Sequence, residues 1–434
     1  MYIHNNFKIN TLNHLEIGGC DAVELAENYG TPLYVMDEDI IRKNMRAYKD
    51  AIDKYYDGNG KAYYASKALS AMYMYKLASN EGLGADVVSG GELYTALKAG
   101  FDAKDICFHG NNKSFEEIKM AVENGVGIIA ADSFFELDTI NDIAKDLGKI
   151  QDIIFRIKPG VEAHTHEFIS TGQIDSKFGF AIENGEADEV AKYAKELSNI
   201  RVTGIHCHIG SQIFDLEPFT CAAEIMMNFY IKLKREYSLP LTVLDLGGGF
   251  GISYTKSDTP LEYASYIKAV SEVIKDICKR ENESLPHIHM EPGRSIVGDA
   301  GITLYKIGNI KDIKGVRKYI SVDGGMGDNP RYILYGAEYD GVFANKASDK
   351  PTEKVTVCGK CCESGDVIMK DVLLPKARTG DILAVMSTGA YNYSMSSNYN
   401  RIPRPPVVMA KGGTSKVVVK RETYDDIIRN DVGE

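Results

Sequence analysis

The sequence predicts an α/β chain in which a (β/α)8 barrel is followed by an all-β domain. From about residue 60 to residue 300, short β-rich segments alternate with segments of helical periodicity. Eight such segments fall within roughly 250 residues, which is the size and period of a TIM-like (β/α)8 barrel. Beyond that region the runs are short, β-branched and separated by turn residues. A doubly wound open sheet is the structural alternative.

The expected barrel strands are short apolar runs, each followed by a polar or glycine-bearing junction. They are Ala62–Ala65, Ala85–Val88, Ile106–His109, Gly127–Ala131, Ile153–Ile157, Val202–His208, Thr242–Leu246 and His287–Glu291. Three of the helices between them begin with a serine followed three residues later by glutamate, at Ser89, Ser114 and Ser133, which predicts capping boxes. Gly100 and Gly125 stand where left-handed C-caps are needed.

The all-β domain is predicted from runs after residue 300. They are Gly301–Ile310, Lys318–Val322, Glu353–Val357 and Val417–Lys420. Pro32–Met36 reads as one more strand, which we expect to pair with this C-terminal sheet. The predicted domains are therefore a barrel over residues 36–300 and a β-sandwich or β-barrel domain made of residues 1–35 and 301–434.

Composition narrows the class of protein. The chain has 434 residues, 44% of them hydrophobic, with a net charge of -11, so a nucleic-acid or anionic-membrane partner is disfavoured and a small-molecule partner is expected. No signal-like start or apolar run of about 18 residues is evident. The eight cysteines are scattered except for Cys358, Cys361 and Cys362, which predicts reduced thiols and a cytoplasmic location.

Residues at the carboxyl ends of barrel strands converge, and here they form a chemically coherent set. They are Lys67, Asp86, Asn111, Arg156, His208 with Gly210 and Ser211, Gly247 to Gly249, and Glu291 with Gly293 and Arg294. A lysine in such a place can form a Schiff base with an aldehyde, although a solvated charge is the commoner role. Glycines at 247–249 and 293 allow backbone N–H groups to approach a phosphate, although a tight turn explains them equally well.

Two of these strand ends leave alternatives open. Glu291 would hold a pyridine ring protonated, or would simply pair with Arg294. His206 and His208 point the same way from one strand, and with His164 and His166 they make a candidate metal site, so a metal-dependent hydrolase is the main rival. We prefer a neutral His208 stacked on a flat ring and a structural role for His206.

Seven motifs between Tyr64 and Tyr399 resemble one known family. They are His109–Ser114, Thr171–Gly179, His206–Gln212, Asp245–Gly251, Glu291–Arg294, Cys362–Asp366 and Gly389–Met395. Together they are similar to the alanine-racemase-like, fold type III decarboxylases that depend on pyridoxal 5'-phosphate. The resemblance implies a lyase of amino-acid biosynthesis that carries this cofactor.

The resemblance also implies site roles. Lys67 would bind the cofactor aldehyde, His208 would stack on its ring, Glu291 would pair with the pyridine nitrogen, and Arg156 with Asp86 would lie near the phenolic oxygen. The phosphate would be held by Ser211, Gly248, Gly249, Gly293, Arg294 and Tyr391.

The expected substrate contacts favour a molecule with an amino-acid group at each end. Arg294 and Arg331 can grip a carboxylate, assisted by Tyr335 and Tyr391, and Glu363 can meet the neighbouring ammonium. As substrates, ornithine or lysine would present only a bare distal ammonium and would leave the arginines unpaired. We therefore expect decarboxylation of meso-2,6-diaminopimelate to L-lysine and carbon dioxide, the last step of lysine biosynthesis, or action on another dicarboxylic amino acid.

Cys362 is the expected proton donor after loss of carbon dioxide, because a thiol is protonated at neutral pH. In the family its loop enters the partner subunit's site, which implies a homodimer with shared active sites and an interface formed by the all-β domain. Zinc bound by Cys358, Cys361 and Cys362 would lack a complete ligand set, and we expect no metal. A non-catalytic cofactor carrier would need neither Cys362 nor Glu363.

Overall fold

The computed structural model describes residues 6–161 and 175–433, and these form two compact units. The barrel unit comprises residues 44–251 and 260–293, and the sheet unit comprises residues 1–43, 252–259 and 294–434. The predicted boundary at residues 36–300 differs from this division, because residues 36–43, 252–259 and 294–300 join the sheet unit. His164, His166 and the start of the motif at Thr171 lie outside the described residues.

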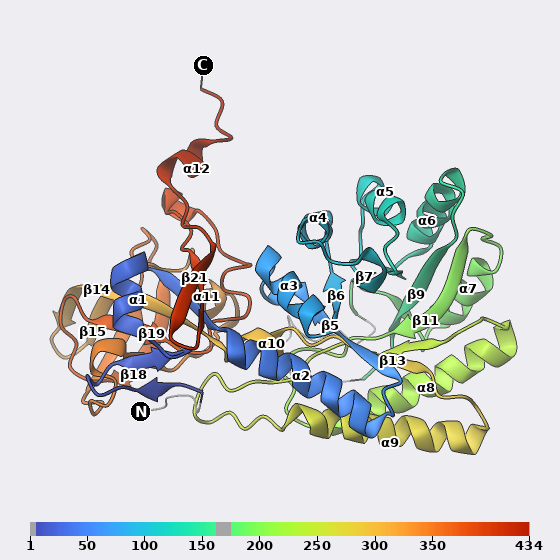
Figure 1. Cartoon of the computed structure of the whole chain (residues 1–434), viewed down its shortest axis with the longest axis horizontal. Coiled ribbons are helices and arrows are strands. Elements are labelled where there is room, and N and C mark those ends of the chain that lie inside the picture. Colours follow the sequence, from blue (N-terminus) through green and yellow to red (C-terminus); the bar gives the residue numbers. More distant parts are fainter. Residues whose placement is uncertain (1–5, 162–174, 434) are drawn as a thin grey trace. The chain divides into compact units, whose positions relative to one another are not determined.

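Eight parallel strands close the barrel, as predicted (Figure 1). They are β5 (Gly60–Ala65), β6 (Gly84–Val87), β7 (Ile106–Phe108), β8 (Ile128–Ala131), β9 (Gln151–Lys158), β11 (Ile200–His206), β12 (Val243–Asp245) and β13 (His287–Met290). The β13 strand pairs with β5 and β8 pairs with β9, so no edge remains within this ring. The short strand β10 (Phe180–Ala181) pairs with β9 alongside the ring.

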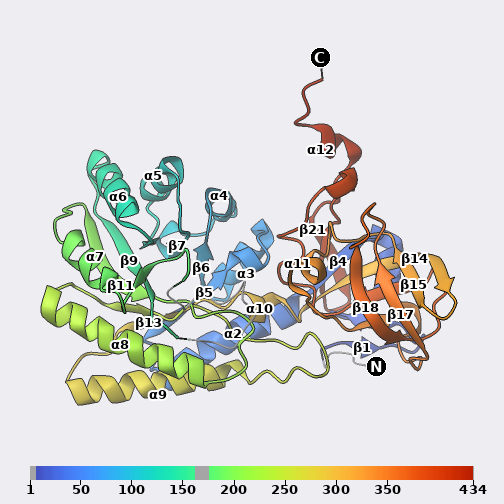
Figure 2. The same cartoon turned by 180° about the vertical axis from the view of Figure 1, so that it is seen from behind.

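Helices follow the strands and cover the outside of the ring, and α8 and α9 run side by side (Figure 2). The helices are α2 (Glu38–Tyr55), which crosses the unit boundary, α3 (Met72–Asn80), α4 (Gly90–Lys98), α5 (Phe115–Asn124), α6 (Phe134–Asp146), α7 (Glu186–Ala194), α8 (Glu217–Tyr237) and α9 (Tyr263–Glu281). Inside the ring, Tyr63, Cys107, Ala130 and Ile154 pack as one apolar layer below the carboxyl ends of the strands.

One of the three predicted capping boxes is complete. Ser114 and Glu117 bond reciprocally at the start of α5, and Gly125 ends that helix in a left-handed conformation. Ser89 and Ser133 cap their helices as predicted, but their glutamates bond the N–H of the residue before the serine, at Val88 and Asp132. Both serines have φ near -155°, against -72° at Ser114, and this extended backbone places the preceding N–H within reach.

The sheet unit is built around one nine-stranded sheet and a small three-stranded one. The strands are β1 (Lys8–Ile9), β2 (Leu15–Ile17), β3 (Cys20–Asp21), β4 (Leu33–Asp37), β14 (Gly301–Ile313), β15 (Arg317–Val322), β16 (Gly341–Phe343), β17 (Glu353–Cys358), β18 (Val367–Leu374), β19 (Ile382–Val385), β20 (Val407–Lys411) and β21 (Thr414–Val419). Short helices lie between them: α1 (Ala22–Tyr29), α10 (Arg294–Val297), α11 (Arg331–Tyr335) and α12 (Tyr424–Ile428).

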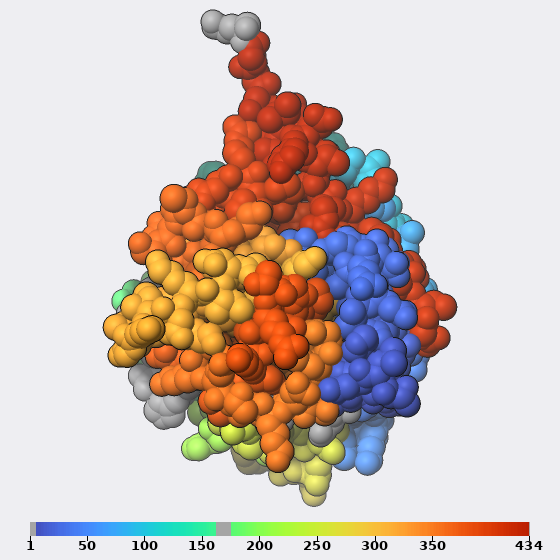
Figure 3. Space-filling view, turned by 90° about the vertical axis from the view of Figure 1, so that its left-hand side faces the viewer, coloured from blue at the N-terminus to red at the C-terminus, as the bar shows by residue number. Residues whose placement is uncertain are grey.

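The N-terminal strand enters the C-terminal sheet, as the sequence predicts. β4 pairs antiparallel with β14 and parallel with β20. Figure 3 shows the N-terminal segment in blue against the orange and red C-terminal part. Leu33 and Val35 on β4 pack with Ile302 and Leu304 on β14 in a fully buried cluster, so burial of alternate side chains fixes this register. No helix in the described ranges is long and apolar enough to span a membrane.

Candidate active site

Lys67 lies in a short 3-10 turn, Ser66–Ala68, directly after β5. The turn is fixed from below, because the buried Ser66 hydroxyl bonds the Asp86 carbonyl oxygen at 2.8 Å and the Glu92 carboxylate at 2.9 Å. Lys67 itself is exposed. Lys67 therefore lies at the end of a barrel strand, as the sequence predicts, and is accessible on a turn that hydrogen bonds fix in place.

Glu291 follows β13, the neighbour of β5, and is only 7% exposed. His206 on β11 places Nε2 3.2 Å from one carboxylate oxygen, and His109, after β7, places Nε2 2.6 Å from the other. The second contact falls outside hydrogen-bond geometry, because Oε1 has no aligned donor among the described residues. Glu291 thus contacts two imidazoles.

These contacts decide the protonation of Glu291. Burial alone would raise its pKa, but His109 and His206 outweigh burial and hold the pKa well below its usual range. Burial lowers the pKa of His206 to about 4, although the Glu291 charge opposes this. A neutral His206 can still donate its Nε2 proton, so we assign an ionised carboxylate bonded to a neutral imidazole.

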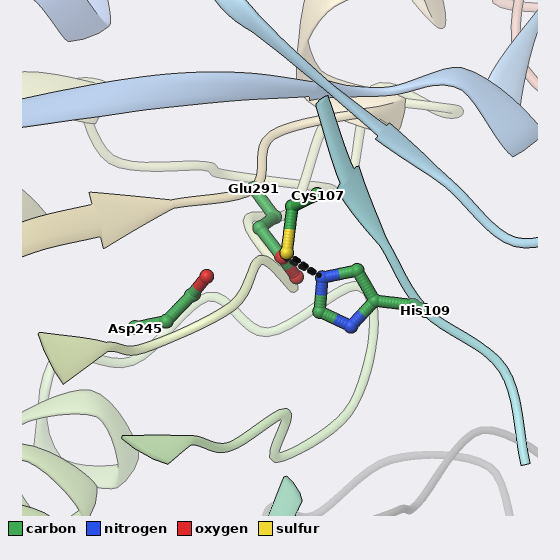
Figure 4. A group of neighbouring side chains, drawn as sticks. All are labelled: Cys107, His109, Asp245 and Glu291. Carbon is green, nitrogen blue, oxygen red and sulfur yellow. Dashed lines mark hydrogen bonds and ion pairs between the residues drawn. The ribbon is translucent and has the colours of Figure 1, made fainter. Parts of the chain in front are cut away.

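Figure 4 shows Glu291 and His109 with two further buried side chains, and the candidate metal-ligand atoms of all four lie within 4.8 Å of one another. They are Cys107, His109, Asp245 and Glu291. The spacing would suit a metal ion. Burial, with the charge of Glu291, raises the pKa of both Cys107 and Asp245 well above their ordinary values, so a thiol and a neutral acid surround one carboxylate. A metal would first have to displace both protons.

Asp86 and Arg156 lie on two strands of the ring, β6 and β9, which β7 and β8 separate. Asp86 on β6 is buried, and burial followed by the Glu291 charge raises its pKa to about 7. His109 and Lys67 lower the pKa of Asp86, so Asp86, Glu291, His109 and Lys67 lie close enough to interact electrostatically. Arg156 on β9 stacks 4.0 Å from the centre of the Phe178 ring and lies 3.9 Å from Asp132.

His208 follows β11 and accepts a hydrogen bond at Nδ1 from the N–H of Gly248, at 3.3 Å. Burial, and then the charges of Lys67 and Arg156, lower its pKa well below the ordinary value, so the ring is neutral with its proton on Nε2. Ser211 is half-buried in the following loop.

The glycine run after β12 brings three strand ends together. A Cβ at Gly248 would lie 2.3 Å from the Glu291 carbonyl oxygen, and one at Gly249 would lie 2.6 Å from the Gly210 oxygen. A Cβ at Gly293 would lie 2.9 Å from Ala65. These positions must therefore be glycine for backbone packing alone, whether or not their N–H groups also bind phosphate.

The sheet unit holds a second cluster, in which two buried arginines lie among tyrosines. The Arg331 guanidinium is 5.8 Å from the ring centres of both Tyr335 and Tyr391, and that of Arg294 is 4.8 Å from Tyr391. Both arginines are 7% exposed. The predicted residues Arg294, Arg331, Tyr335 and Tyr391 are thus brought together, around Tyr254 and Tyr339, which the sequence did not single out.

Cys362 and Glu363 occupy the loop between β17 and β18. Asp366, which is buried, accepts the N–H groups of Met326 at 2.7 Å and Cys361 at 2.8 Å, and the N–H of Cys362 bonds Asn400 at 2.7 Å. Cys362 and Glu363 are nevertheless exposed. The loop backbone is fixed while the two predicted functional side chains face solvent.

Comparison with known proteins identifies the class. Residues 38–298 match the family "Pyridoxal-dependent decarboxylase, pyridoxal binding domain", which is more than half of the chain. The chain is 50% identical to a diaminopimelate decarboxylase of Bacillus subtilis over 434 residues, covering 100% of this chain and 98% of the relative. It is 51% identical to that of Bacillus methanolicus over 422 residues, covering 97% and 98%.

Solved structures agree. The diaminopimelate decarboxylase from M. jannaschii in complex with L-lysine superposes with a TM-score of 0.92 at 38% identity, covering 100% of this chain and 99% of that one. Fold and site define a pyridoxal-dependent decarboxylase. The chain belongs to the diaminopimelate decarboxylase family.

The barrel unit fits the cofactor of this class. An exposed lysine amine is available to an aldehyde, and Glu291 Oε1 is buried with no donor in hydrogen-bond geometry within the described residues, which suits a pyridine N–H. The neutral His208 ring suits stacking on a flat ring without charge repulsion.

Sequence reasoning missed part of this site. The residue after β7 that reaches Glu291 is His109, whereas the sequence reading chose Asn111 from that strand end. His206, given only a structural role, contacts Glu291 directly. A signal existed for both, because each lies within a strand-end motif. Tyr254 and Tyr339 had none, since they are two of 26 tyrosines in the chain.

Proposed function

We propose that the protein removes one carboxyl group from meso-2,6-diaminopimelate, giving L-lysine and carbon dioxide, as the last step of lysine biosynthesis. One observation carries the proposal: an exposed lysine, Lys67, and a buried, ionised carboxylate, Glu291, follow two adjacent barrel strands. Pyridoxal phosphate, when bound, would supply a ring that accepts the electron pair left on the α-carbon when its bond to the departing carbon dioxide breaks. Action on another dicarboxylic amino acid is the close alternative.

The proposed cofactor contacts follow the family resemblance. Lys67 would hold the aldehyde covalently, Glu291 would keep the ring nitrogen protonated, and His208 would pack on the ring face. Asp86 and Arg156 are assigned to the phenolic oxygen. The phosphate contacts are assigned to Ser211, Gly248, Gly249, Gly293, Arg294 and Tyr391. The neutrality of His208 and the electrostatic coupling of Asp86, Lys67 and Glu291 support these assignments.

The proposed substrate contacts lie in the sheet unit. Arg294 and Arg331 bind the distal carboxylate, the one that stays on the product, with Tyr335 and Tyr391 beside them. Two buried guanidiniums close to the same tyrosine rings support an anionic ligand there, because like charges in a poorly solvated place repel one another. Glu363 is assigned to the distal ammonium.

Cys362 is proposed to deliver the proton that replaces the lost carboxylate, in the active site of a partner subunit of a homodimer. The thiol is exposed on a loop whose backbone is fixed, which supports its reaching into the active site of another subunit. All eight cysteines are free thiols, which supports the proposed cytoplasmic location.

The cofactor and reaction are tested together by recording the visible spectrum and then adding meso-diaminopimelate. We expect a band at about 420 nm, which disappears in Lys67→Ala, and formation of L-lysine by the wild type. A band without lysine would redirect the proposal to other dicarboxylic amino acids. Loss of activity on metal chelation, without any band, would favour a metal site at the group in Figure 4.

Shared active sites are tested by mixing two inactive variants, Lys67→Ala and Cys362→Ala. Cys362→Ala alone should keep the cofactor band and lose most turnover. If the thiol acts across the dimer, random mixing restores about one quarter of the wild-type sites, because half of the dimers are mixed and each has one intact site. No recovery after subunit exchange would place both residues in the same chain's site.

A further inference from the structure

Tyr254 lies at the centre of the arginine cluster in the sheet unit. Arg294 donates a hydrogen bond from a terminal nitrogen to the Tyr254 hydroxyl, and the Arg331 guanidinium lies 5.0 Å from the centre of the same ring. Tyr254 is 7% exposed. One phenol thus contacts both arginines, one through its oxygen and the other through its ring.

Tyr339 completes the arrangement on the Arg331 side. Its hydroxyl accepts a hydrogen bond from Arg331 at 3.1 Å and donates one to Asn392 at 3.3 Å. The rings of Tyr254 and Tyr339 meet edge to face, 5.5 Å apart with planes at 83°. Each guanidinium therefore has one nitrogen fixed by a phenol, while the two phenols hold one another in place.

The backbone around Tyr254 is fixed to the sheet unit. The Asp258 carboxylate accepts the N–H of Tyr254 at 2.9 Å, and the Tyr254 carbonyl accepts the N–H of Asp340 at 3.3 Å. The Ser387 hydroxyl bonds the Ser253 carbonyl at 2.8 Å. The bonds to Asp340 and Ser387 thus attach the segment 252–259 to the rest of the sheet unit, and Tyr254 cannot move away from the arginines without breaking them.

The charges give this geometry a function. Among the described residues, no carboxylate lies within 4 Å of the Arg331 guanidinium, although this side chain is 7% exposed. Burial would raise the pKa of Tyr254, but the charges of Arg294 and Arg331 outweigh it and lower the pKa. The phenol oxygen therefore balances only part of the positive charge of the two arginines, and a fully charged anion can still bind there.

We propose that Tyr254 is a positioning residue that sets the orientation of Arg294 and Arg331 for the distal carboxylate, and so determines selectivity for ligands that carry a distal amino-acid group. Tyr339 acts in the same way on Arg331 alone. This inference rests on the proposed function, because it concerns the end of the substrate that the reaction leaves intact.

The chemistry of the proposed reaction supplies a matched pair of probes. L-lysine keeps the amino-acid group that the arginines would bind, whereas 1,5-diaminopentane has the same chain and two amines but no carboxylate. A residue that orients the arginines must affect the first ligand and spare the second. General damage to the fold would weaken both.

The experiment compares Tyr254→Phe with the wild-type holoenzyme. This variant keeps the ring against Arg331 and loses the oxygen that holds Arg294. We expect the Kd of L-lysine and the KM of meso-diaminopimelate to rise about tenfold to a hundredfold, which is the usual effect of losing a hydrogen bond to a charged group. We expect kcat, the cofactor band and the Kd of 1,5-diaminopentane to change less than threefold.

Tyr193→Phe is the matched control. Its hydroxyl bonds Asp138 at 2.5 Å on the exposed surface of the barrel unit, so the variant loses a bonded phenol oxygen in the unit that does not contain the arginines. Wild-type values are expected for it. Unchanged L-lysine binding in Tyr254→Phe, or equal weakening of both ligands, would overturn the inference. A wild-type enzyme that neither binds L-lysine nor acts on diaminopimelate would overturn the proposed function instead.

Discussion

The two units keep buried charge in opposite ways. In the barrel unit, buried carboxyl groups crowd together, and burial raises the pKa of Asp86 and Asp245, while Glu291 stays ionised through two imidazoles. In the sheet unit, two buried guanidiniums are surrounded by phenols. The first arrangement selects which group holds a proton. The second gathers two positive charges among phenols, where we propose that an anion binds.

This contrast separates two kinds of effect. Substitutions at the carboxylate and imidazole cluster should alter chemical steps and protonation, whereas substitutions at the arginine cluster should alter ligand affinity. A variant that mixed the two effects would show that the clusters do not act separately. The first two predictions below follow this division and the third concerns a buried histidine of the barrel unit, in order of decreasing effect.

Glu291→Gln should lower kcat by about 10²-fold to 10³-fold, the scale for removing one preorganised electrostatic contact. An amide cannot hold a ring nitrogen protonated as a carboxylate does. Steady-state kinetics with meso-diaminopimelate measure the effect, and L-lysine binding should stay near the wild-type value. Glu262→Gln, an exposed site before α9, is the control. A kcat within twofold of wild type would remove the assigned role of Glu291.

Arg331→Ala should raise the KM for meso-diaminopimelate by about 10²-fold while the cofactor band remains, because truncating one partner of a buried charge contact costs about 3 kcal/mol. Arg331→Lys should recover only part of this loss, since an ammonium lacks the planar fork. Arg201→Ala, which removes an exposed guanidinium paired with Asp152, serves as the control. An unchanged kcat/KM in Arg331→Ala would exclude its role at the distal carboxylate.

His289→Gln should make stability less sensitive to acid. Burial lowers the pKa of His289 to about 3, and the nearby Glu291 charge only partly opposes this. A depressed pKa gives stability that is present above the unfolded value of about 6.5 and is lost as pH falls toward the folded value. Between pH 7.5 and 5, the wild type should lose about 2 kcal/mol more than the variant. Urea unfolding at the two pH values measures this, and equal losses would contradict it.

The sequence predicted the fold well, for physical reasons. All eight barrel strands were found because a strand buried on both faces reads as a short apolar run between capped helices. The predicted bond from the glutamate back to the serine N–H was wrong at Ser89 and Ser133. The residue pattern does not show the backbone conformation of the serine, on which this bond depends. The predicted barrel boundary also differs from the division by contacts, since residues 252–259 bond to distant parts of the chain such as Asp340.

The candidate site was predicted by strand ends rather than by contacts. The rule located Lys67, Asp86 and Glu291, but it did not tell which of His109 and Asn111 turns toward the centre of the ring. Tyr254 and Tyr339 became visible only through the fold, since residues 85 positions apart meet across the sheet unit (339 minus 254). Roles in binding and proton transfer stay predictions until the variants are measured.

The pairing of β4 with strands from the far end of the chain also orders events during synthesis. β4 ends at residue 37, and its parallel partner β20 begins at residue 407, so 370 residues separate them (407 minus 37). At roughly 5–20 residues per second, this strand waits on the order of 20–75 s for β20. The barrel strands are complete at residue 290, well before β20 is made. A ribosome-bound chain stopped just before residue 407 should therefore hold a barrel ahead of a finished sheet, with one edge of its first long strand still unpaired.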